Sequence, residues 1–180
     1  MPARTYVAFL RGVNLGRHRR VQMGSLRELL ESHDHQGVRT YLQSGNVVLG
    51  STLSATKLEA ALERQIADGL GFDVDVLVRT ADELAAILAL DPLAAVVSDP
   101  ARYLVTFLRT EPDKALAARL RSAIVAPEQV VAAGRELYSW HPAGLGRSEL
   151  AKLLLPQSLG LTASGRNWRT VEKLAALAAS

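Results

Sequence analysis

The chain has 180 residues, 48% of them hydrophobic, and a formal net charge of +3. A chain of this length and composition can bury a core without metals or cross-links to support it. The absence of cysteine excludes disulfide frameworks, thiolate zinc sites and cysteine nucleophiles. The N-terminal apolar run is too short for a signal peptide, and no stretch approaches the roughly 20 apolar residues of a membrane span. We therefore expect a cytoplasmic protein that contacts no membrane.

The first half of the chain reads in the order β-α-β-β-α-β. Alternating or β-branched runs predict strands at residues 5–11, 37–43, 46–50 and 72–79. Recurring leucines predict a helix at 22–32 and a second one that Ser54 caps and that Gly69 and Gly71 end. This order is that of the split β-α-β plait of the ferredoxin-like fold.

A capping box formed by Thr80 and Glu83 begins a connecting helix, which Pro92 stops. Beyond it the order β-α-β-β-α recurs, with strands at 102–109, 127–132 and 135–141, a helix opened by Pro112 and a short helix capped by Ser148. The spacing of Val171, Leu174 and Leu177 then predicts a helix where the sixth strand of a plait would stand.

The predicted fold class is therefore α+β, with two ferredoxin-like plait subdomains packed together and the second modified at its C-terminal end. We assign residues 1–80 to the first plait, 81–101 to a connecting helix and linker, and 102–180 to the second plait with its C-terminal helices.

The predicted hairpin at residues 39–48 carries more polar side chains than a plain hairpin needs. Turn geometry accounts for Gly45 and partly for Asn46, since glycine and asparagine tolerate positive φ. It does not account for Tyr41 and Gln43. We therefore predict that the hairpin borders a binding site through Tyr41, Gln43, Ser44 and Asn46.

Positive charge is concentrated in the N-terminal segment. The arginines that precede Glu28, the first acidic residue, are Arg4, Arg11, Arg17, Arg19, Arg20 and Arg27. The first loop, residues 11–20, could therefore bind a phosphate or carboxylate through its guanidinium and backbone N–H groups. A solvated basic loop explains it equally well, because the loop matches neither GxGxxG nor GxxxxGK[ST]. The residues that we assign to the site from this loop are Arg11, Asn14, Arg17, Arg19 and Arg20.

Arg166, Asn167 and Trp168 near the start of the last helix bring a guanidinium, an amide and an aromatic ring together. Such a group can stack on and hydrogen-bond a base or a sugar. Alternatively, Trp168 anchors the helix in the core and Asn167 caps it. Packing accounts best for Trp168 alone, whereas anchoring requires neither Arg166 nor Asn167, so we assign the segment to the site.

Four segments of the chain together resemble the DUF1697 family: residues 6–16, Met23 with Leu26, residues 38–47 and residues 166–171. The resemblance covers essentially the whole chain. It implies a bacterial protein with two plait-type α+β subdomains, and it implies no established activity. Family members usually carry glycine, lysine and asparagine after the first loop, where this chain has residues 17–20, and asparagine where Arg169 stands.

These observations favour a protein that binds an anionic ligand, either a small phosphorylated metabolite such as a nucleotide or a nucleic acid. An enzyme with a cleft between the plaits stays open, with Tyr41 or His141 as acid or base. A protein-interaction module without a small ligand also stays open. We expect no cofactor and no metal site, since His33 and His35 have no evident third ligand. Asp73 and Asp75, on a predicted edge strand, are interpreted as opposing edge pairing.

Overall fold

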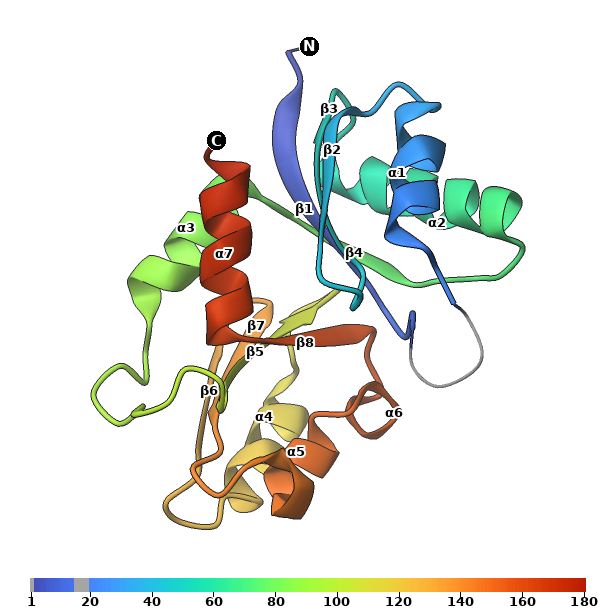
Figure 1. The fold of residues 1–180 in the computed structure, drawn as a ribbon. Helices are drawn as coiled ribbons and strands as arrows, with labels where there is room; N and C mark the ends of the chain where they lie inside the picture. The colour runs from blue at the N-terminus through green and yellow to red at the C-terminus, as the bar shows by residue number, and fades with distance from the viewer. Residues whose placement is uncertain (1, 15–19) are drawn as a thin grey trace. The chain divides into compact units, whose positions relative to one another are not determined.

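The structure is a computed structural model that describes residues 2–14 and 20–180 (Figure 1). The chain divides into two compact units: unit 1 comprises Met1–Ile87 and Lys173–Ser180, and unit 2 comprises Leu88–Glu172. Both divisions fall inside a helix, the first in α3 (Ala81–Leu90) and the second in α7 (Trp168–Ala178). The chain therefore leaves unit 1 once and returns to it for its last eight residues.

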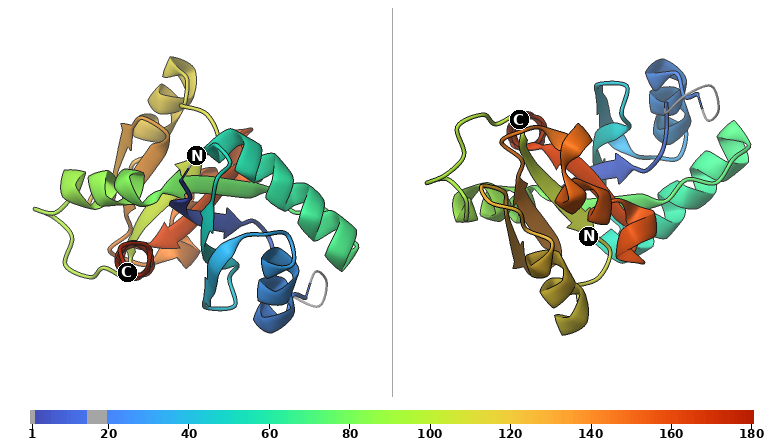
Figure 2. Two further views of the ribbon diagram at one scale, coloured as in Figure 1. Left: turned by 90° about the horizontal axis from the view of Figure 1, so that it is seen from above. Right: turned by 90° about the horizontal axis from the view of Figure 1, so that it is seen from below.

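Unit 1 contains one antiparallel sheet with the strand order β2-β3-β1-β4. Its strands are β1 (Arg4–Leu10), β2 (Gln36–Tyr41), β3 (Asn46–Ser51) and β4 (Val76–Thr80). The helices α1 (Met23–Glu31) and α2 (Ala55–Leu70) pack on one face of this sheet (Figures 1 and 2). Element order and strand order are those of a ferredoxin-like plait, which confirms the predicted fold class for this half.

The core of unit 1 follows from two periodicities in the sequence. Alternate residues of β1, namely Tyr6, Ala8 and Leu10, face the helices because successive strand side chains point to opposite sides. Leu58 and Leu62, spaced one turn apart on α2, meet them in the same buried cluster. Ser54 stands at the N-cap of α2 but its side chain makes no capping hydrogen bond, so the predicted cap is wrong in that detail.

The outer edge of β4 is closed by side chains instead of by another strand. Among the strands in the described part of the chain, β4 pairs only with β1, so the N–H groups of alternate β4 residues point away from the sheet. A glutamate carboxylate accepts from each of them: Glu63 from Val76 at 3.0 Å, Glu59 from Val78 at 2.8 Å and Glu83 from Thr80 at 2.7 Å. The last bond belongs to the predicted capping box, which is completed by Glu83 N–H donating to Thr80 Oγ1 at 3.1 Å.

Unit 2 repeats the same topology with the strand order β6-β7-β5-β8, again antiparallel throughout. Its strands are β5 (Tyr103–Leu108), β6 (Gln129–Ala133), β7 (Glu136–Trp140) and β8 (Ala163–Asn167). Its helical segments are α4 (Lys114–Ser122), η1 (Leu145–Arg147), α5 (Glu149–Leu153) and α6 (Pro156–Leu159). The sequence predicts that Pro112 opens α4. The residue after it, Asp113, is the N-cap, and its side chain accepts from Leu116 N–H at 2.7 Å.

The predicted helix in place of a sixth strand is wrong. Residues 163–167 form β8, which pairs with β5, and α7 begins only at Trp168. The stripe of Val171, Leu174 and Leu177 belongs to this later helix. β8 carries no alternating apolar pattern, because its residues are Ala-Ser-Gly-Arg-Asn, so its strand character depends on pairing with β5 rather than on its own sequence.

Within the parts of the chain that the structure describes, no helix has the length and apolar character needed to cross a membrane.

Candidate functional site

The β2–β3 hairpin of unit 1 is held by a buried asparagine. β2 ends at Tyr41, which is half-buried, and Gln43 and Ser44 are exposed in the turn that follows. The fully buried Asn46 donates from its side-chain amide to the Tyr41 carbonyl at 2.8 Å and to Ser44 Oγ at 3.0 Å. Asn46 therefore holds the turn, whose exposed side chains are those of Leu42, Gln43 and Ser44.

Gly45 brings the hairpin turn into close contact with the end of β1. Its φ is +76°, and its carbonyl accepts from Leu10 N–H at 2.8 Å. A Cβ at this position would lie 2.5 Å from Val13 Cγ2 and 2.8 Å from Leu10 Cβ. Glycine is required here by both the positive φ and the lack of space for a Cβ. The sequence indicates only the first of these two reasons.

Asn14 joins the first loop to the hairpin turn. Its side-chain amide donates to the Gln43 carbonyl at 2.7 Å and to the Val21 carbonyl at 3.1 Å, and its Oδ1 accepts from Val21 N–H at 2.8 Å. One side chain thus joins Asn14 to Val21, the residue that follows residues 15–20, and to the hairpin turn. We call residues 15–20 the basic loop, since three of the six are arginines and one is histidine.

The arginines assigned to the site from the first loop, residues 11–20, differ in their surroundings. Arg17 and Arg19 lie outside the described residues, and Arg20 is exposed. Arg11 is paired with Asp75. Its side-chain Nη1 lies 2.6 Å from Asp75 Oδ2, and its backbone N–H donates to the Asp75 carbonyl at 2.9 Å. Asp75 therefore neutralises Arg11, whereas Arg20 is exposed.

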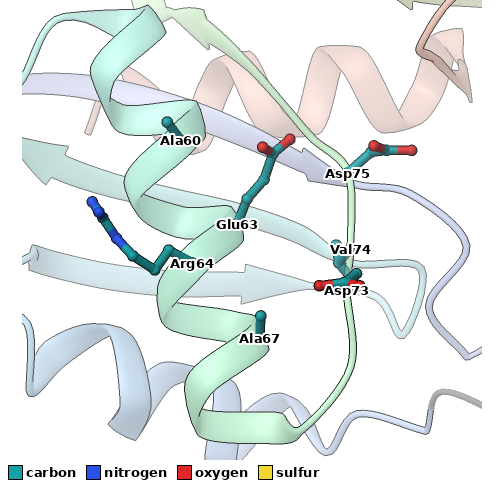
Figure 3. Close-up of a pocket in the computed structure, with 7 residues that line it drawn as sticks. All are labelled: Ala60, Glu63, Arg64, Ala67, Asp73, Val74 and Asp75. Carbon is teal, nitrogen blue, oxygen red and sulfur yellow. The ribbon is translucent and has the colours of Figure 1, made fainter.

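A groove of about 440 Å³ lies between α2 and residues 73–75, and it is acidic. Figure 3 shows Glu63 between the helix and this segment, whereas Arg64 points to the opposite side. The Glu63 carboxylate accepts from Val76 N–H and Asp75 pairs with Arg11, which leaves Asp73 exposed. No group of His, Cys, Asp or Glu side chains in residues 2–14 and 20–180 is arranged to hold a metal ion. The carboxylates of Glu63, Asp73 and Asp75 make the groove unfavourable for an anion.

In unit 2, Arg166 contacts its own strand. Its Nη1 donates to Ser164 Oγ and to the Gly165 carbonyl, both at 2.8 Å. Desolvation by burial lowers the pKa of Arg166 to about 10, so the guanidinium stays charged at neutral pH.

The neighbours of Arg166 stabilise the start of α7. Asn167 Oδ1 accepts from Thr170 N–H at 2.9 Å, which makes Asn167 the N-cap of the helix. Trp168 is buried and stacks on Tyr103, with ring centroids 4.7 Å apart and planes inclined by 17°. Asn167 therefore caps α7 and Trp168 anchors it in the core, which are the structural alternatives that the sequence left open for these residues. Both residues belong to unit 2, whereas the hairpin and the basic loop belong to unit 1.

A buried polar network surrounds His141 at the end of β7. Its Nε2 lies 2.9 Å from Ser139 Oγ, and its Nδ1 lies 3.0 Å from Ser148 Oγ and 3.3 Å from Glu128 Oε1. Burial lowers the pKa of His141, and Glu128 opposes this with a smaller upward effect. Ser148 also caps α5 by accepting from Ala151 N–H at 2.8 Å, as predicted.

This network has the residue types of a serine–histidine–carboxylate triad, but a substrate cannot reach them. Ser139 and His141 are both fully buried, so neither reaches a substrate in this conformation. The sequence indicates His141 as a candidate acid or base from its place at a strand end, and it does not reveal this burial. The network accordingly supports the fold of unit 2 instead of an acid–base reaction.

Comparison with known proteins shows the fold and the family. The conserved bacterial protein SP0830 from Streptococcus pneumoniae has a similar structure, with a TM-score of 0.77 and 24% sequence identity over 98% of this chain and 99% of that one. A comparison with curated proteins found no match. The model of the family described as "Protein of unknown function (DUF1697)" matches residues 3–138. The chain belongs to the DUF1697 family.

Proposed function

We propose that the protein binds an anionic, phosphate-bearing ligand at the basic loop of unit 1, beside the β2–β3 turn. The observation that carries this proposal is the position of Asn14, whose side chain bonds both Val21, which follows the basic loop, and the Gln43 carbonyl of the turn. The sequence between the fixed ends supplies Arg17, Arg19 and Arg20.

The anchored loop supports ligand binding for an energetic reason. A loop whose ends are already fixed loses less conformational freedom when it closes on a ligand than a free segment does. Guanidinium groups bind phosphate oxygens in pairs through parallel N–H donors. The exposed Gln43 and Ser44 side chains stand next to the anchor and supply further donors and acceptors.

The other residues assigned to the site have weaker support. Asn14 and Asn46 hold backbone groups, and Arg11 is paired with Asp75. Arg166 stays charged and remains a proposed ligand contact, with Asn167 and Trp168 positioning its strand end against α7. The proposal therefore rests on Arg17, Arg19, Arg20, Gln43 and Ser44.

Binding is tested by fluorescence anisotropy with labelled single-stranded RNA and DNA, and by thermal shift with mononucleotides and sugar phosphates. The decisive variant carries Arg17→Ala, Arg19→Ala and Arg20→Ala together. Arg121→Ala is the matched control, because Arg121 is an exposed arginine on α4 of unit 2. A ligand at 100 times its Kd adds about 2.7 kcal/mol of stability, which a thermal shift detects.

Two positive results are distinguishable. Oligonucleotide binding that weakens with salt, and whose log–log salt slope falls by about 0.7–0.9 for each arginine removed, assigns a nucleic acid. A saturable thermal shift from one small phosphate, lost in the triple variant and kept in Arg121→Ala, assigns a metabolite. Equal binding by the triple variant and the unaltered protein would refute the site, and so would the absence of binding to every probe.

A further inference from the structure

Unit 2 contains a second groove, which is mainly apolar and is lined by residues of unit 2. It has a volume of about 470 Å³ and lies between the β5–β8 part of the sheet and the η1–α5–α6 segment. Leu104 and Thr106 of β5 and Gly165 of β8 line it on the sheet side. Leu145, Lys152 and Leu155 line it on the helical side.

A break in the helical layer accounts for this groove. In unit 1 the connection between the third and fourth strands is the single 16-residue helix α2, which packs along the sheet. In unit 2 the corresponding connection is divided into the five-residue α5 and the four-residue α6, visible as separate short segments in Figure 1. Pro156 begins α6 and prevents α5 from continuing through it. Two short helices cover less of the sheet than one long helix, and Gly165 adds no side chain to fill the remaining space.

Thr106 gives the groove a polar group on its sheet side. The residue is only 2% exposed, and its hydroxyl oxygen lies 3.6 Å from the place that a Cβ on Gly165 would take. A hydroxyl both donates and accepts hydrogen bonds. A ligand oxygen that accepts from this hydroxyl would be fixed in orientation within a mainly apolar groove.

The rim of the groove combines apolar side chains with one positive charge. Leu145 and Leu155 are 43% and 45% exposed, which is unusual for large apolar residues that border the same opening. Lys152 is the only charged residue that lines the groove within the described chain, and its Nζ lies 2.5 Å from Glu149 Oε1. An exposed ion pair of this kind is weak, so the ammonium is available to a second anion.

We propose that this groove binds a small amphipathic carboxylate. Its apolar body lies against Leu104, Leu145 and Leu155, where burial removes hydrocarbon from water. Its carboxylate oxygens accept from the Thr106 hydroxyl and compensate the charge of Lys152. A volume of about 470 Å³ falls within the range of small-molecule sites.

The test uses the full-length protein and decanoate as the probe, with decan-1-ol as its neutral counterpart of the same chain length. A titration followed by amide NMR spectra locates the probe, and calorimetry measures its Kd. We expect decanoate to shift the amide signals of Gly146, Ala151 and Gly165, and decanol to bind at least several-fold more weakly.

Two variants separate the proposed contacts. Thr106→Val removes the hydroxyl at nearly constant shape and should weaken decanoate about five- to tenfold, whereas Thr106→Ser should retain most of the affinity. Lys152→Gln should weaken decanoate but not decanol. Lys114→Gln, at an exposed lysine of α4, is the matched control and should leave both affinities unchanged.

The proposal is overturned if decanoate shifts no groove amide at millimolar concentration, or if Thr106→Val binds as tightly as the unaltered protein. Equal affinity for decanoate and decanol, unaffected by Lys152→Gln, would overturn the choice of a carboxylate. None of these results bears on phosphate binding at the basic loop, so the two proposals fail or stand independently.

Discussion

At the scale of single residues, Asn14 meets a requirement of both backbone and side chain. Its φ is +57°, in the left-handed region where asparagine is among the few tolerated non-glycine residues. Its amide also supplies the two donors and one acceptor that Gln43 and Val21 need. Glycine would satisfy the first requirement only, and glutamine has a longer side chain that does not fit the same bonds.

We expect Asn14→Gly to lower the free energy of unfolding by about 1–3 kcal/mol, because it removes these hydrogen bonds without backbone strain. Asn14→Ala should lower it by roughly a further 1 kcal/mol, since alanine is disfavoured in the left-handed region. Urea denaturation of both variants measures the two contributions. Unchanged stability in Asn14→Gly would show that Asn14 does not anchor the basic loop.

His141 makes the stability of the protein depend on pH. Burial lowers the pKa of His141 in the folded protein below its ordinary value of about 6.5, so the folded state favours the neutral ring. The unfolded chain therefore binds the proton first as pH falls. We expect stability to be fully present above about pH 6.5 and to decrease as pH falls from there toward the folded-state pKa.

The measurement is the free energy of unfolding by urea between about pH 7.5 and 5.5. His141→Gln should flatten the slope in this window, because glutamine does not titrate. His33→Gln is the matched control, since His33 is exposed at the end of α1. A slope that His141→Gln leaves unchanged would contradict the assignment.

At the scale of elements, β4 shows how an edge strand is protected. Its outward N–H groups are satisfied by carboxylates from α2 and from the first turn of α3, so no free donor remains among Val76, Val78 and Thr80 for another strand to use. Asp73 and Asp75, which the sequence indicates as the protective residues, precede this strand, and Asp75 instead pairs with Arg11.

Of the two acceptors on α2, Glu59 is the more buried, with 9% of its surface exposed. We expect Glu59→Ala to lower the free energy of unfolding by about 1–3 kcal/mol, because Val78 N–H loses its acceptor. Glu59→Gln should lose less, since the amide oxygen still accepts. Chemical denaturation measures both, with Glu28→Ala on the exposed side of α1 as control. Equal losses in the alanine and glutamine variants would argue against a hydrogen-bond role.

Elements were predictable where their signals are local. The capping box of Thr80 and Glu83 and the cap at Ser148 involve residues three apart, so the sequence alone reveals them. The acceptors of Val76 and Val78 lie 13 and 19 residues away, and β8 depends on pairing with β5. Such contacts form only in the folded chain, and no residue pattern within β8 announces them.

At the scale of the whole molecule, the order of elements predicts the strand order of the first sheet, because a β-α-β-β-α-β chain with short connections has few ways to form a plait. In the second sheet only β5, β6 and β7 were predictable, since the sequence does not indicate β8. The candidate site was less predictable. The sequence predicts the polar residues of the hairpin as ligand contacts, yet the side chain of Asn46 hydrogen-bonds within the turn and holds it. Residue type shows that Asn46 is unusual for its place, but only the hydrogen-bond partners show what it does.

Arg39 ties the C-terminus of the chain to the edge strand β2 within unit 1. Its Nη2 donates to the Leu177 carbonyl at 2.6 Å, and its Nη1 donates to Ser180 Oγ at 2.7 Å. The guanidinium therefore supplies a donor to a carbonyl in the last turn of α7, where carbonyls have no partner within the helix. We expect Arg39→Ala to lower the free energy of unfolding by about 0.5–1.5 kcal/mol. It should also accelerate hydrogen exchange in the last turn of α7.

Hydrogen exchange followed by mass spectrometry measures this local effect, and Arg27→Ala on α1 is the matched exposed control. Arg39→Lys should restore part of the protection through its single ammonium group. Unchanged exchange near Leu177 in Arg39→Ala would show that the contact does not hold the helix end.

The return of residues 173–180 to unit 1 also has a consequence for the order of events during synthesis. Unit 2 is continuous in sequence, so all of its residues are synthesised before the last segment of unit 1, residues 173–180. Unit 1 therefore lacks part of its structure until that segment has followed Ile87, which takes on the order of 5 to 20 s at usual elongation rates. The unit that is begun first is the unit that is completed last, and Arg39 meets Leu177 and Ser180 only after the whole of unit 2 has been synthesised.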